Sequence, residues 1–248
     1  MVRSLFLASV LLCGSTFVMA QDAGKDVSLS SLRVQALKAL QKGDNAAAIL
    51  SADAMTRLHP DDQRAMRLSA DIYLRTGKID WAVRLFDRYV KERPADLPEL
   101  WQRGIALYFA GEFKRAAKQF EEHRKVNPND VENAAWHFLC IAKADSFEAA
   151  TKALLPAPND RRPPMDEVLK MLKSGDTDTV NKRVDSIAED SAARGDAEFY
   201  RDFYLGLYAD AKGEQKKATK LLERSANDAP HHYMGDIARV YAKHLAEK

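Results

Sequence analysis

Apolar and small residues recur with a 34-residue period through the first half of the chain. Three consecutive units, at 29–62, 63–96 and 97–130, each contain a helix-forming run, a glycine, a second helix-forming run and a proline. The residues that keep the same place in all three units are Gly43, Gly77 and Gly111, then Ala48, Ala82 and Ala116, then Pro60, Pro94 and Pro128. A strict period with a fixed internal order predicts stacked helical hairpins rather than one globular core.

Each repeated residue has a physical role in such a hairpin. Glycine suits the tight turn after the first helix because it tolerates positive φ. The alanine lies one turn into the second helix, where a small side chain lets the two helices approach closely. Proline ends the second helix because it cannot continue it. The residues four positions after each alanine lie on the same helical face: Ala52, Phe86 and Phe120. An aspartate follows two positions after each proline, where it can cap or enter the next helix: Asp62, Asp96 and Asp130.

This pattern resembles the tetratricopeptide repeat. The second unit supplies Met66, Ala70, Tyr73, Gly77, Ala82, Phe86 and Pro94, and the third supplies Leu100, Gly104, Leu107, Gly111, Ala116, Phe120 and Pro128. The first unit is weaker, and a further unit at 199–232 supplies Leu205, Gly206, Gly213, Ala218, Leu222 and Pro230. The resemblance implies an all-α fold, a right-handed superhelical solenoid of helix-turn-helix repeats with a C-terminal capping helix.

Between the third and the last clear repeat, at 131–198, the pattern diverges. We expect a helical hairpin at 131–155, a proline-rich loop at 156–164 and two short helices at 165–172 and 178–188. Gly213 lies three repeat lengths after Gly111, so both two eroded units and a chance match fit the spacing. The capping helix is expected at 233–248, where one apolar side can cover the last repeat or dock on a partner subunit.

The first 20 residues read as a secretory signal peptide. Arg3 precedes an apolar stretch that ends in a small-x-small site at Ala20, which predicts an exported protein with a loose N-terminus at 21–28. Cys13 raises the alternative of a lipid anchor, but Leu12 stands where a lipobox requires a small residue. No later segment is long and apolar enough to cross a bilayer. We therefore expect a periplasmic or secreted protein, with an outer-membrane-anchored lipoprotein as the alternative.

Composition argues against several classes of function. Lys and Arg total 38 against 36 Asp and Glu, and this near-neutral balance gives no reason to expect nucleic acid as a partner. Cys140 lies in an apolar helical context, which predicts a packing role. The sequence holds no phosphate loop, catalytic motif or metal-ligand pair, and adjacent His231 and His232 would point about 100° apart on a helix. We expect no catalytic residues, no metal and no cofactor.

A narrower resemblance comes from the order of segments. The repeats are followed by a Trp-His-Phe-Leu-Cys stretch at 136–140, then by Phe-Tyr-Leu-Gly at 203–206 and His-His-Tyr-Met-Gly at 231–235. This order is similar to the NlpI-like bacterial envelope branch of tetratricopeptide proteins. The resemblance implies an envelope adaptor, anchored and homodimeric in that branch, that is linked to peptidoglycan hydrolases and their proteolysis. The poor lipobox departs from this pattern.

If the chain is an adaptor, its binding surface is expected on the concave face, which the first helix of each hairpin lines. The family pattern places these side chains there: Arg33, Arg64, Arg67, Asp71, Arg75, Trp101, Ile105, Tyr108 and Phe109. A basic end beside an aromatic wall suits a protein or extended peptide with carboxylates and apolar anchors. The alternative for each residue is a solvated face or packing between repeats. The carboxylate clamp of chaperone-binding repeats does not transfer, since Leu37 and Asp71 stand where it requires asparagine.

Two other functions compete with an adaptor. A homodimeric assembly protein would pair its exposed end repeats, and light scattering would distinguish a dimer from a monomer. A cell-wall or peptide hydrolase would show turnover that one carboxylate or histidine substitution abolishes. Non-catalytic protein binding is the function that the sequence favours.

Overall fold

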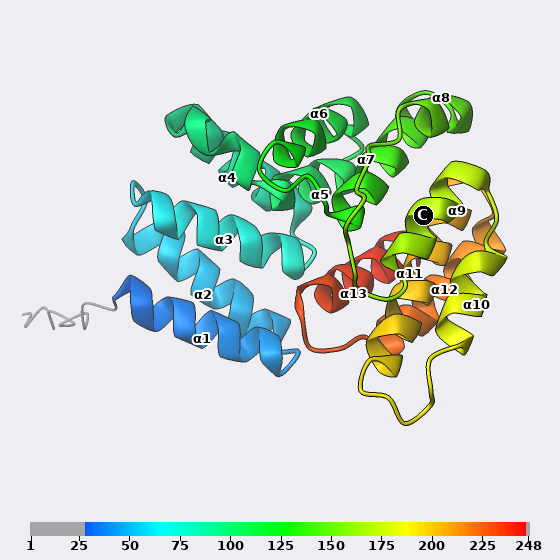
Figure 1. Ribbon diagram of the computed structural model, residues 1–248. Helices are drawn as coiled ribbons and strands as arrows, with labels where there is room; N and C mark the ends of the chain where they lie inside the picture. The colour runs from blue at the N-terminus through cyan, green and yellow to red at the C-terminus, as the bar shows by residue number, and fades with distance from the viewer. Residues whose placement is uncertain (1–27, 247–248) are drawn as a thin grey trace, which may run out of the picture.

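The computed structural model describes residues 28–246, and the regular elements of that part of the chain are helices (Figure 1). The expected signal peptide, Cys13 and residues 247–248 lie outside the described residues. Six helical hairpins follow one another and a last helix closes the chain. They are α1 (Leu29–Gln41) and α2 (Asn45–Leu58), α3 (Gln63–Arg75) and α4 (Ile79–Glu92), α5 (Trp101–Phe109) and α6 (Phe113–Arg124), α7 (Val131–Ala144) and α8 (Phe147–Lys152), α9 (Met165–Ser174) and α10 (Asp178–Asp185), α11 (Arg194–Ala211) and α12 (Gln215–Asn227), and α13 (Tyr233–Ala246).

The repeated glycines make the hairpin turns, as the sequence predicted. Their φ angles of 70° to 78° lie in the left-handed region that glycine adopts without strain: Gly43, Gly77, Gly111 and Gly213. In the second hairpin the amide of Lys78 then donates to the carbonyl of Tyr73 at 2.7 Å, which ties the turn to the end of α3.

The repeated alanines are fully buried where the two helices of a hairpin meet: Ala48, Ala82, Ala116 and Ala218. Gly104 extends this close packing in the third hairpin, because a Cβ there would lie 2.6 Å from the ring of Phe120. Gly206 does the same against Leu222 in the last hairpin. Small residues on the first helix thus accept large ones from the second, and the hairpins stack as an all-α tetratricopeptide-type solenoid.

Two of the three predicted aspartates cap a helix. Asp62 accepts from the amides of Arg64 and Ala65 at the start of α3, and Asp130 accepts from the amide of Glu132 at the start of α7. Asp96 does not cap α5. It lies in a 3₁₀ helix, η1 (Pro94–Glu99), and accepts from the hydroxyl of Tyr89 at 2.6 Å, because Pro98 delays α5 until Trp101.

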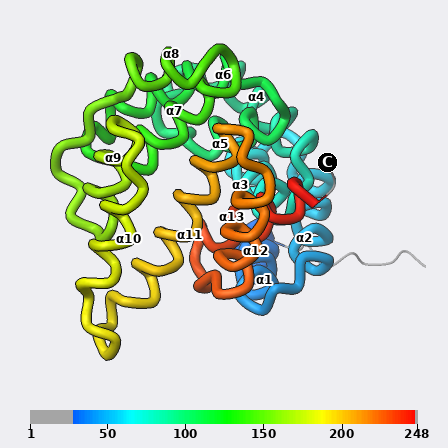
Figure 2. Tube along the Cα trace, turned by 90° about the vertical axis from the view of Figure 1, so that its right-hand side faces the viewer, coloured from blue at the N-terminus to red at the C-terminus, as the bar shows by residue number. Residues whose placement is uncertain are grey.

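The divergent middle continues the stack and then turns it. Residues 156–164 form no regular element between α8 and α9, as the prolines predicted, and α9 packs against both α7 and α11. The tube in Figure 2 shows α9 and α10 at one side of the molecule, with α11 and α12 beside them and in front of the first hairpins in this view. Cys140 is fully buried in α7, in agreement with its predicted packing role, and burial raises the pKa of its thiol.

Helix α13 differs most from the expectation. It packs on α12, as a capping helix would, but it also reaches α3 of the second hairpin inside the curve of the stack (Figures 1 and 2). Arg75 pairs with Asp236 at 2.7 Å, and the hydroxyl of Tyr233 donates to Asp71 at 2.7 Å. The solenoid therefore closes on itself, and its own last helix occupies part of the concave face. No helix of the described residues is long and apolar enough to span a membrane.

Candidate functional site

The concave face is divided into two cavities by the contact of α13 with α3. On one side lies a cavity of about 520 Å³ that we call the basic cleft, lined by Arg33, Arg64, Arg67, Asp71, Arg93 and Gln102 among others. On the other lies a cavity of about 290 Å³ that we call the aromatic pocket, lined by Trp101, Glu132, Asn133, Trp136, Tyr200 and His232 among others. Asp71 borders the first and Tyr233 the second, so the hydrogen bond between these two residues marks the boundary.

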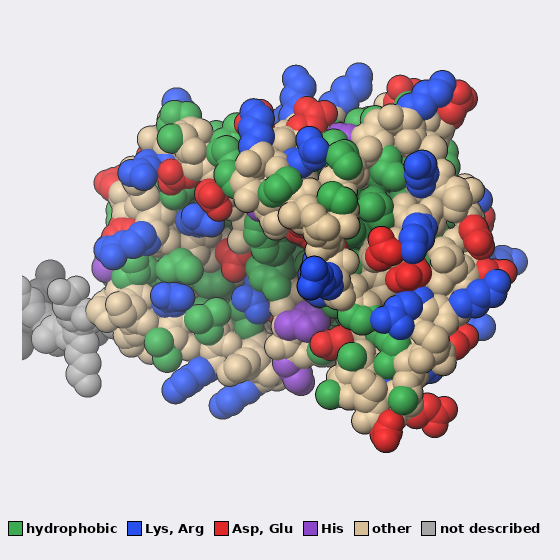
Figure 3. All heavy atoms as spheres, in the orientation of Figure 1, with side chains coloured by type: hydrophobic (Ala, Val, Ile, Leu, Met, Phe, Trp, Pro, Cys, Tyr) green, Lys and Arg blue, Asp and Glu red, His purple; other side chains and the backbone are tan. Residues whose placement is uncertain are grey.

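The basic cleft gathers four guanidinium groups from α1, α3 and the end of α4. Arg64 meets Asp62 at 3.3 Å in an exposed pair, and Arg93 meets Asp96 at the same distance. Arg67 donates to the carbonyl oxygen of Glu99 at 3.4 Å and also interacts with the hydroxyl of Tyr89. The space-filling view shows hydrophobic side chains in the hollow of this face with Lys and Arg side chains around them (Figure 3).

Two further groups shape the cleft. The side-chain oxygen Oε1 of Gln102 is buried with no hydrogen-bond partner among the described residues. Asp71 is partly buried, and this desolvation raises the pKa of its carboxyl group, while Tyr233 and Arg75 oppose the rise. The cleft therefore offers several donors with positive charge and one unpaired acceptor to an incoming chain.

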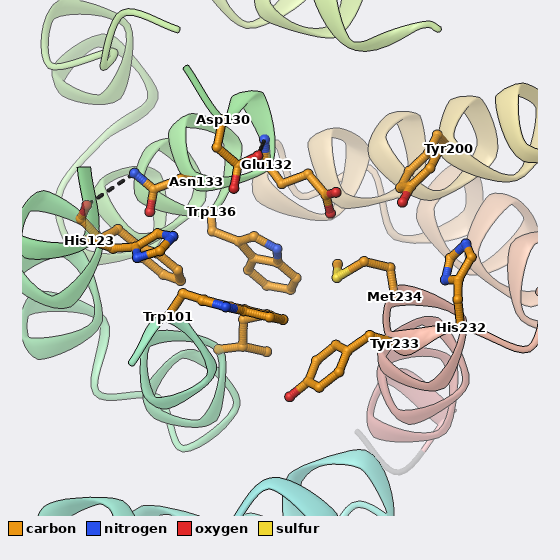
Figure 4. A pocket seen from close by; sticks show the side chains of 12 residues that line it. Trp101, His123, Asp130, Glu132, Asn133, Trp136, Tyr200, His232, Tyr233 and Met234 are labelled. Atoms are coloured by element: carbon orange, nitrogen blue, oxygen red, sulfur yellow. Dashed lines mark hydrogen bonds between the residues drawn. The ribbon is translucent and has the colours of Figure 1, made fainter. Parts of the chain in front are cut away.

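The aromatic pocket is built from rings on five helices, α5, α6, α7, α11 and α13. Trp101 from α5 lies edge-on to Tyr233 from α13, with ring centres 4.7 Å apart, and Tyr200 from α11 stacks on His232 at 5.9 Å. Trp136 from α7 lies next to Trp101, and the side chain of Met234 extends toward it from α13 (Figure 4). The walls are thus flat and apolar on opposite sides.

Three polar atoms of the pocket lining have no partner among the described residues. They are Nε1 of Trp136, Oδ1 of Asn133 and Nε2 of His232. The amide of Gly235 donates to Nδ1 of His232 at 3.1 Å, so the proton of the neutral ring is on Nε2. Burial lowers the pKa of His232, which favours this neutral form.

Glu132 supplies a carboxylate at the edge of the pocket. Burial raises the pKa of its carboxyl group, whereas the ion pair with Arg162 lowers it. The hydroxyl of Tyr204 donates to Glu132 at 2.9 Å, and Arg162 also pairs with Asp130 at 3.0 Å. The carboxylate is therefore held in a fixed position by partners outside the pocket.

The predicted concave residues are on the inner side of the stack, but they do not form one open surface. Arg33, Arg64, Arg67 and Asp71 meet at the basic cleft, and Trp101 and Ile105 line the aromatic pocket. The other three are covered by α13: Arg75, Tyr108 and Phe109. Tyr108 and Phe109 are only 5% and 6% exposed, so the expected open aromatic wall is partly closed by the protein's own last helix.

No pattern in the sequence indicates that Glu132, Tyr200 and His232 share a pocket with Trp101. These residues come from the fourth hairpin, α11 and the start of α13, where the 34-residue period no longer applies. The stretch at 136–140 contributed to the family resemblance but did not predict a pocket. Among residues 28–246 no group of three metal-ligating side chains is close enough to hold an ion.

Part of the chain matches a known family. Residues 33–96 match the family model of the tetratricopeptide repeat, and this match covers most of the first predicted unit and all of the second. A crystal structure of a tetratricopeptide repeat protein from Parabacteroides merdae is similar, with 14% identity, a TM-score of 0.46, and coverage of 88% of this chain and 98% of that chain. The resemblance to the NlpI-like branch stays a prediction.

Proposed function

We propose that this protein is a non-catalytic adaptor that holds an acidic, extended segment of a protein partner in the basic cleft. Tetratricopeptide repeats support a role in protein–protein interaction. The observation that carries the finer proposal is the convergence of four arginines on one cavity of about 520 Å³. Arginine forms bidentate hydrogen bonds with carboxylates, so this cluster suits glutamate or aspartate side chains.

The unpaired oxygen of Gln102 supports an extended peptide rather than a small anion. A peptide presents backbone N–H groups beside its side chains, and one such group can donate to Gln102 while carboxylates meet Arg64 or Arg67. A fully deprotonated inorganic anion such as sulfate offers only acceptors and would leave this oxygen unpaired.

A titration with a synthetic peptide tests the proposal. A fluorescein-labelled, glutamate-rich decapeptide is expected to bind the protein, while the same peptide with glutamines in place of glutamates binds at least roughly tenfold more weakly, the loss of about one charge-assisted contact. Affinity should fall as salt rises, because exposed charges are screened within about 8–10 Å at physiological ionic strength. Equal affinity for the two peptides would contradict an acidic ligand.

We further propose export to the cell envelope, where the partner belongs to the set of peptidoglycan hydrolases or proteases. The support is the signal-like sequence ending at Ala20 and the order of segments that resembles the NlpI-like branch. Mass determination of the protein from the producing cell tests the first part, with a mature N-terminus at Gln21 as the expected result. A protein mass increased by that of a lipid attached to Cys13 would instead indicate the anchored form.

The homodimeric assembly function is the alternative. The apolar side of α13, which could either cap the last repeat or dock on a partner subunit, is already buried within the chain at Met234, Ile237 and Tyr241. A dimer would therefore use another surface, and light scattering on the mature protein checks whether one forms.

A further inference from the structure

The aromatic pocket combines unpaired polar atoms with flat apolar walls. Buried polar groups in proteins nearly always have hydrogen-bond partners, so three unpaired atoms around one cavity need an explanation. Trp136 is 1% exposed and Asn133 is 4% exposed, yet Nε1 of the first and Oδ1 of the second have no partner among the described residues. A bound ligand that accepts from Nε1 would account for the unpaired atom of Trp136.

The size and walls of the pocket limit the body of such a ligand. The cavity of about 290 Å³ is at the lower limit of ligand sites, which suits a single ring rather than a cofactor. Trp101, Trp136 and Tyr200 present aromatic surface, and aromatic rings pack well edge-on or offset against such walls. The body of the ligand is therefore a six-membered aromatic ring or a group of similar shape.

The polar atoms limit its polar end. Nε1–H of Trp136 and Nε2–H of His232 are donors, whereas Oδ1 of Asn133 and the carboxylate of Glu132 are acceptors. Figure 4 shows the indole nitrogen of Trp136 and the carboxylate of Glu132 on the same side of the pocket. A hydroxyl group both accepts and donates, so it can satisfy this pair at once.

Other side chains match less well. A phenylalanine has no polar atom, and lysine or arginine has no acceptor for the donors of Trp136 and His232. A carboxylate would meet the charge of Glu132 without a donor to offer. Tryptophan donates only, and would leave Trp136 unpaired.

We propose that the aromatic pocket binds the side chain of a tyrosine from the protein partner. The source of the tyrosine rests on the proposed adaptor function, whereas the affinity of the pocket for a phenol does not. The pocket and the basic cleft meet at the contact between Tyr233 and Asp71. One segment with a tyrosine and acidic neighbours can therefore occupy both cavities.

The first experiment titrates the ¹⁵N-labelled full chain with p-cresol and, separately, with toluene. Binding is monitored in the NMR spectrum through the indole N–H signals of Trp81, Trp101 and Trp136. We expect p-cresol to shift the signal of Trp136 and to bind roughly tenfold more tightly than toluene, the ratio of about one hydrogen bond to a buried donor. Trp81 is 55% exposed on α4 and serves as the internal control, with no shift expected. The comparison of the two probes on the unmodified protein needs no variant to fold.

A variant then separates the hydrogen bond from the apolar contact. Trp136→Phe keeps an aromatic ring but removes the donor. The affinity for p-cresol is therefore expected to fall to that for toluene, while the affinity for toluene changes less than about twofold. Equal affinity of p-cresol and toluene for the unmodified protein would overturn the proposal. Tighter binding of butylammonium than of p-cresol would also overturn it, because the pocket would then be a cation cage.

The second experiment asks whether the phenol comes from a peptide. A peptide of one tyrosine flanked by glutamates is compared with its phenylalanine form on the unmodified protein and on Arg67→Glu. We expect the tyrosine form to bind roughly tenfold more tightly on both proteins, while Arg67→Glu weakens both peptides. If the tyrosine and phenylalanine peptides bound with equal affinity while p-cresol still bound, the proposal that the phenol comes from a peptide would be overturned. If Arg67→Glu did not weaken either peptide while the tyrosine form still bound more tightly, only the proposed role of the basic cleft would be contradicted.

Discussion

At the scale of single residues, Asp210 joins four helices through one carboxylate. Lys143 of α7 pairs with it at 2.8 Å, and the hydroxyl of Tyr241 in α13 donates to it at 2.8 Å. Tyr241 in turn contacts the hydroxyl of Tyr108 in α5 at 2.9 Å. Burial alone would raise the pKa of Asp210, but the hydrogen bonds from Lys143 and Tyr241 lower it below its ordinary value.

Asp210→Asn tests this buried contact. The substitution removes the charge that pairs with Lys143, so we expect a loss of about 2–3 kcal/mol in the free energy of unfolding at pH 7. Because the folded-state pKa is lowered, the contribution is present above the ordinary value of 3.8 and is lost as pH falls through the folded-state value. Urea titrations at several pH values should show the two proteins converging in acid. Asp190→Asn, at an exposed position, is the control and should leave stability unchanged.

Gly104 offers a second test at the residue scale. A Cβ at Gly104 would lie 2.6 Å from the buried ring of Phe120, which itself stacks on Trp136 with ring centres 6.5 Å apart. Gly104→Ala is therefore expected to lower the melting temperature, with a cost of about 1–3 kcal/mol from overpacking. Gly195 is also helical but has no atom within 4 Å of its Cβ position, so Gly195→Ala should stabilise by about 0.5–1 kcal/mol. An unchanged melting temperature in Gly104→Ala would mean that the repeats pack less tightly than the structure shows.

At the scale of elements, α13 is held on α3 by polar contacts as well as by apolar packing. Arg75 pairs with Asp236 at 2.7 Å and lies 5.0 Å from the ring centre of Tyr233. The side chains of Arg75 and Asp236 are only 14% and 10% exposed, so the pair is shielded from water and worth more than a surface ion pair.

Arg75→Ala should therefore loosen α13 without unfolding the stack. We expect amide hydrogen exchange in residues 233–246 to accelerate by at least roughly tenfold, since about 1.4 kcal/mol of local stability corresponds to that factor. Exchange in α9 and α10 should stay unchanged. Arg88→Ala is the matched control, because Arg88 is 43% exposed and pairs with the exposed Asp61. Unchanged exchange in α13 would show that apolar packing alone holds this helix.

The elements also show how far the sequence predicts the structure. The turns at Gly43, Gly77 and Gly111 and the burial of Ala82 and Ala116 follow from local rules that the period repeats. The return of α13 to α3 joins residues 161 positions apart and occurs once, so no periodic signal announces it. Asp96 enters the 3₁₀ helix η1 and does not cap α5, since Pro98 delays the start of α5 for a local reason.

At the scale of the whole molecule, the closed solenoid changes what the concave face can bind. The predicted basic end is the part that stays open, because α13 covers Arg75, Tyr108 and Phe109 but leaves Arg33, Arg64 and Arg67 at the cleft. The aromatic pocket could not be predicted, since it requires the fourth hairpin, α11 and α13 to meet in space. The open binding surface is therefore shorter than the repeat pattern alone implies.

The central claim is that the open cleft holds an acidic segment through its arginines. The most direct test is the anisotropy titration of the glutamate-rich peptide on the unmodified protein, on Arg67→Glu and on Arg88→Glu. Arg67→Glu should weaken binding at least roughly tenfold, because it replaces an attractive contact by a repulsive one. Arg88→Glu makes the same change in charge outside the cleft and should alter the affinity less than about twofold. Equal losses in the two variants, or none in Arg67→Glu, would contradict the account.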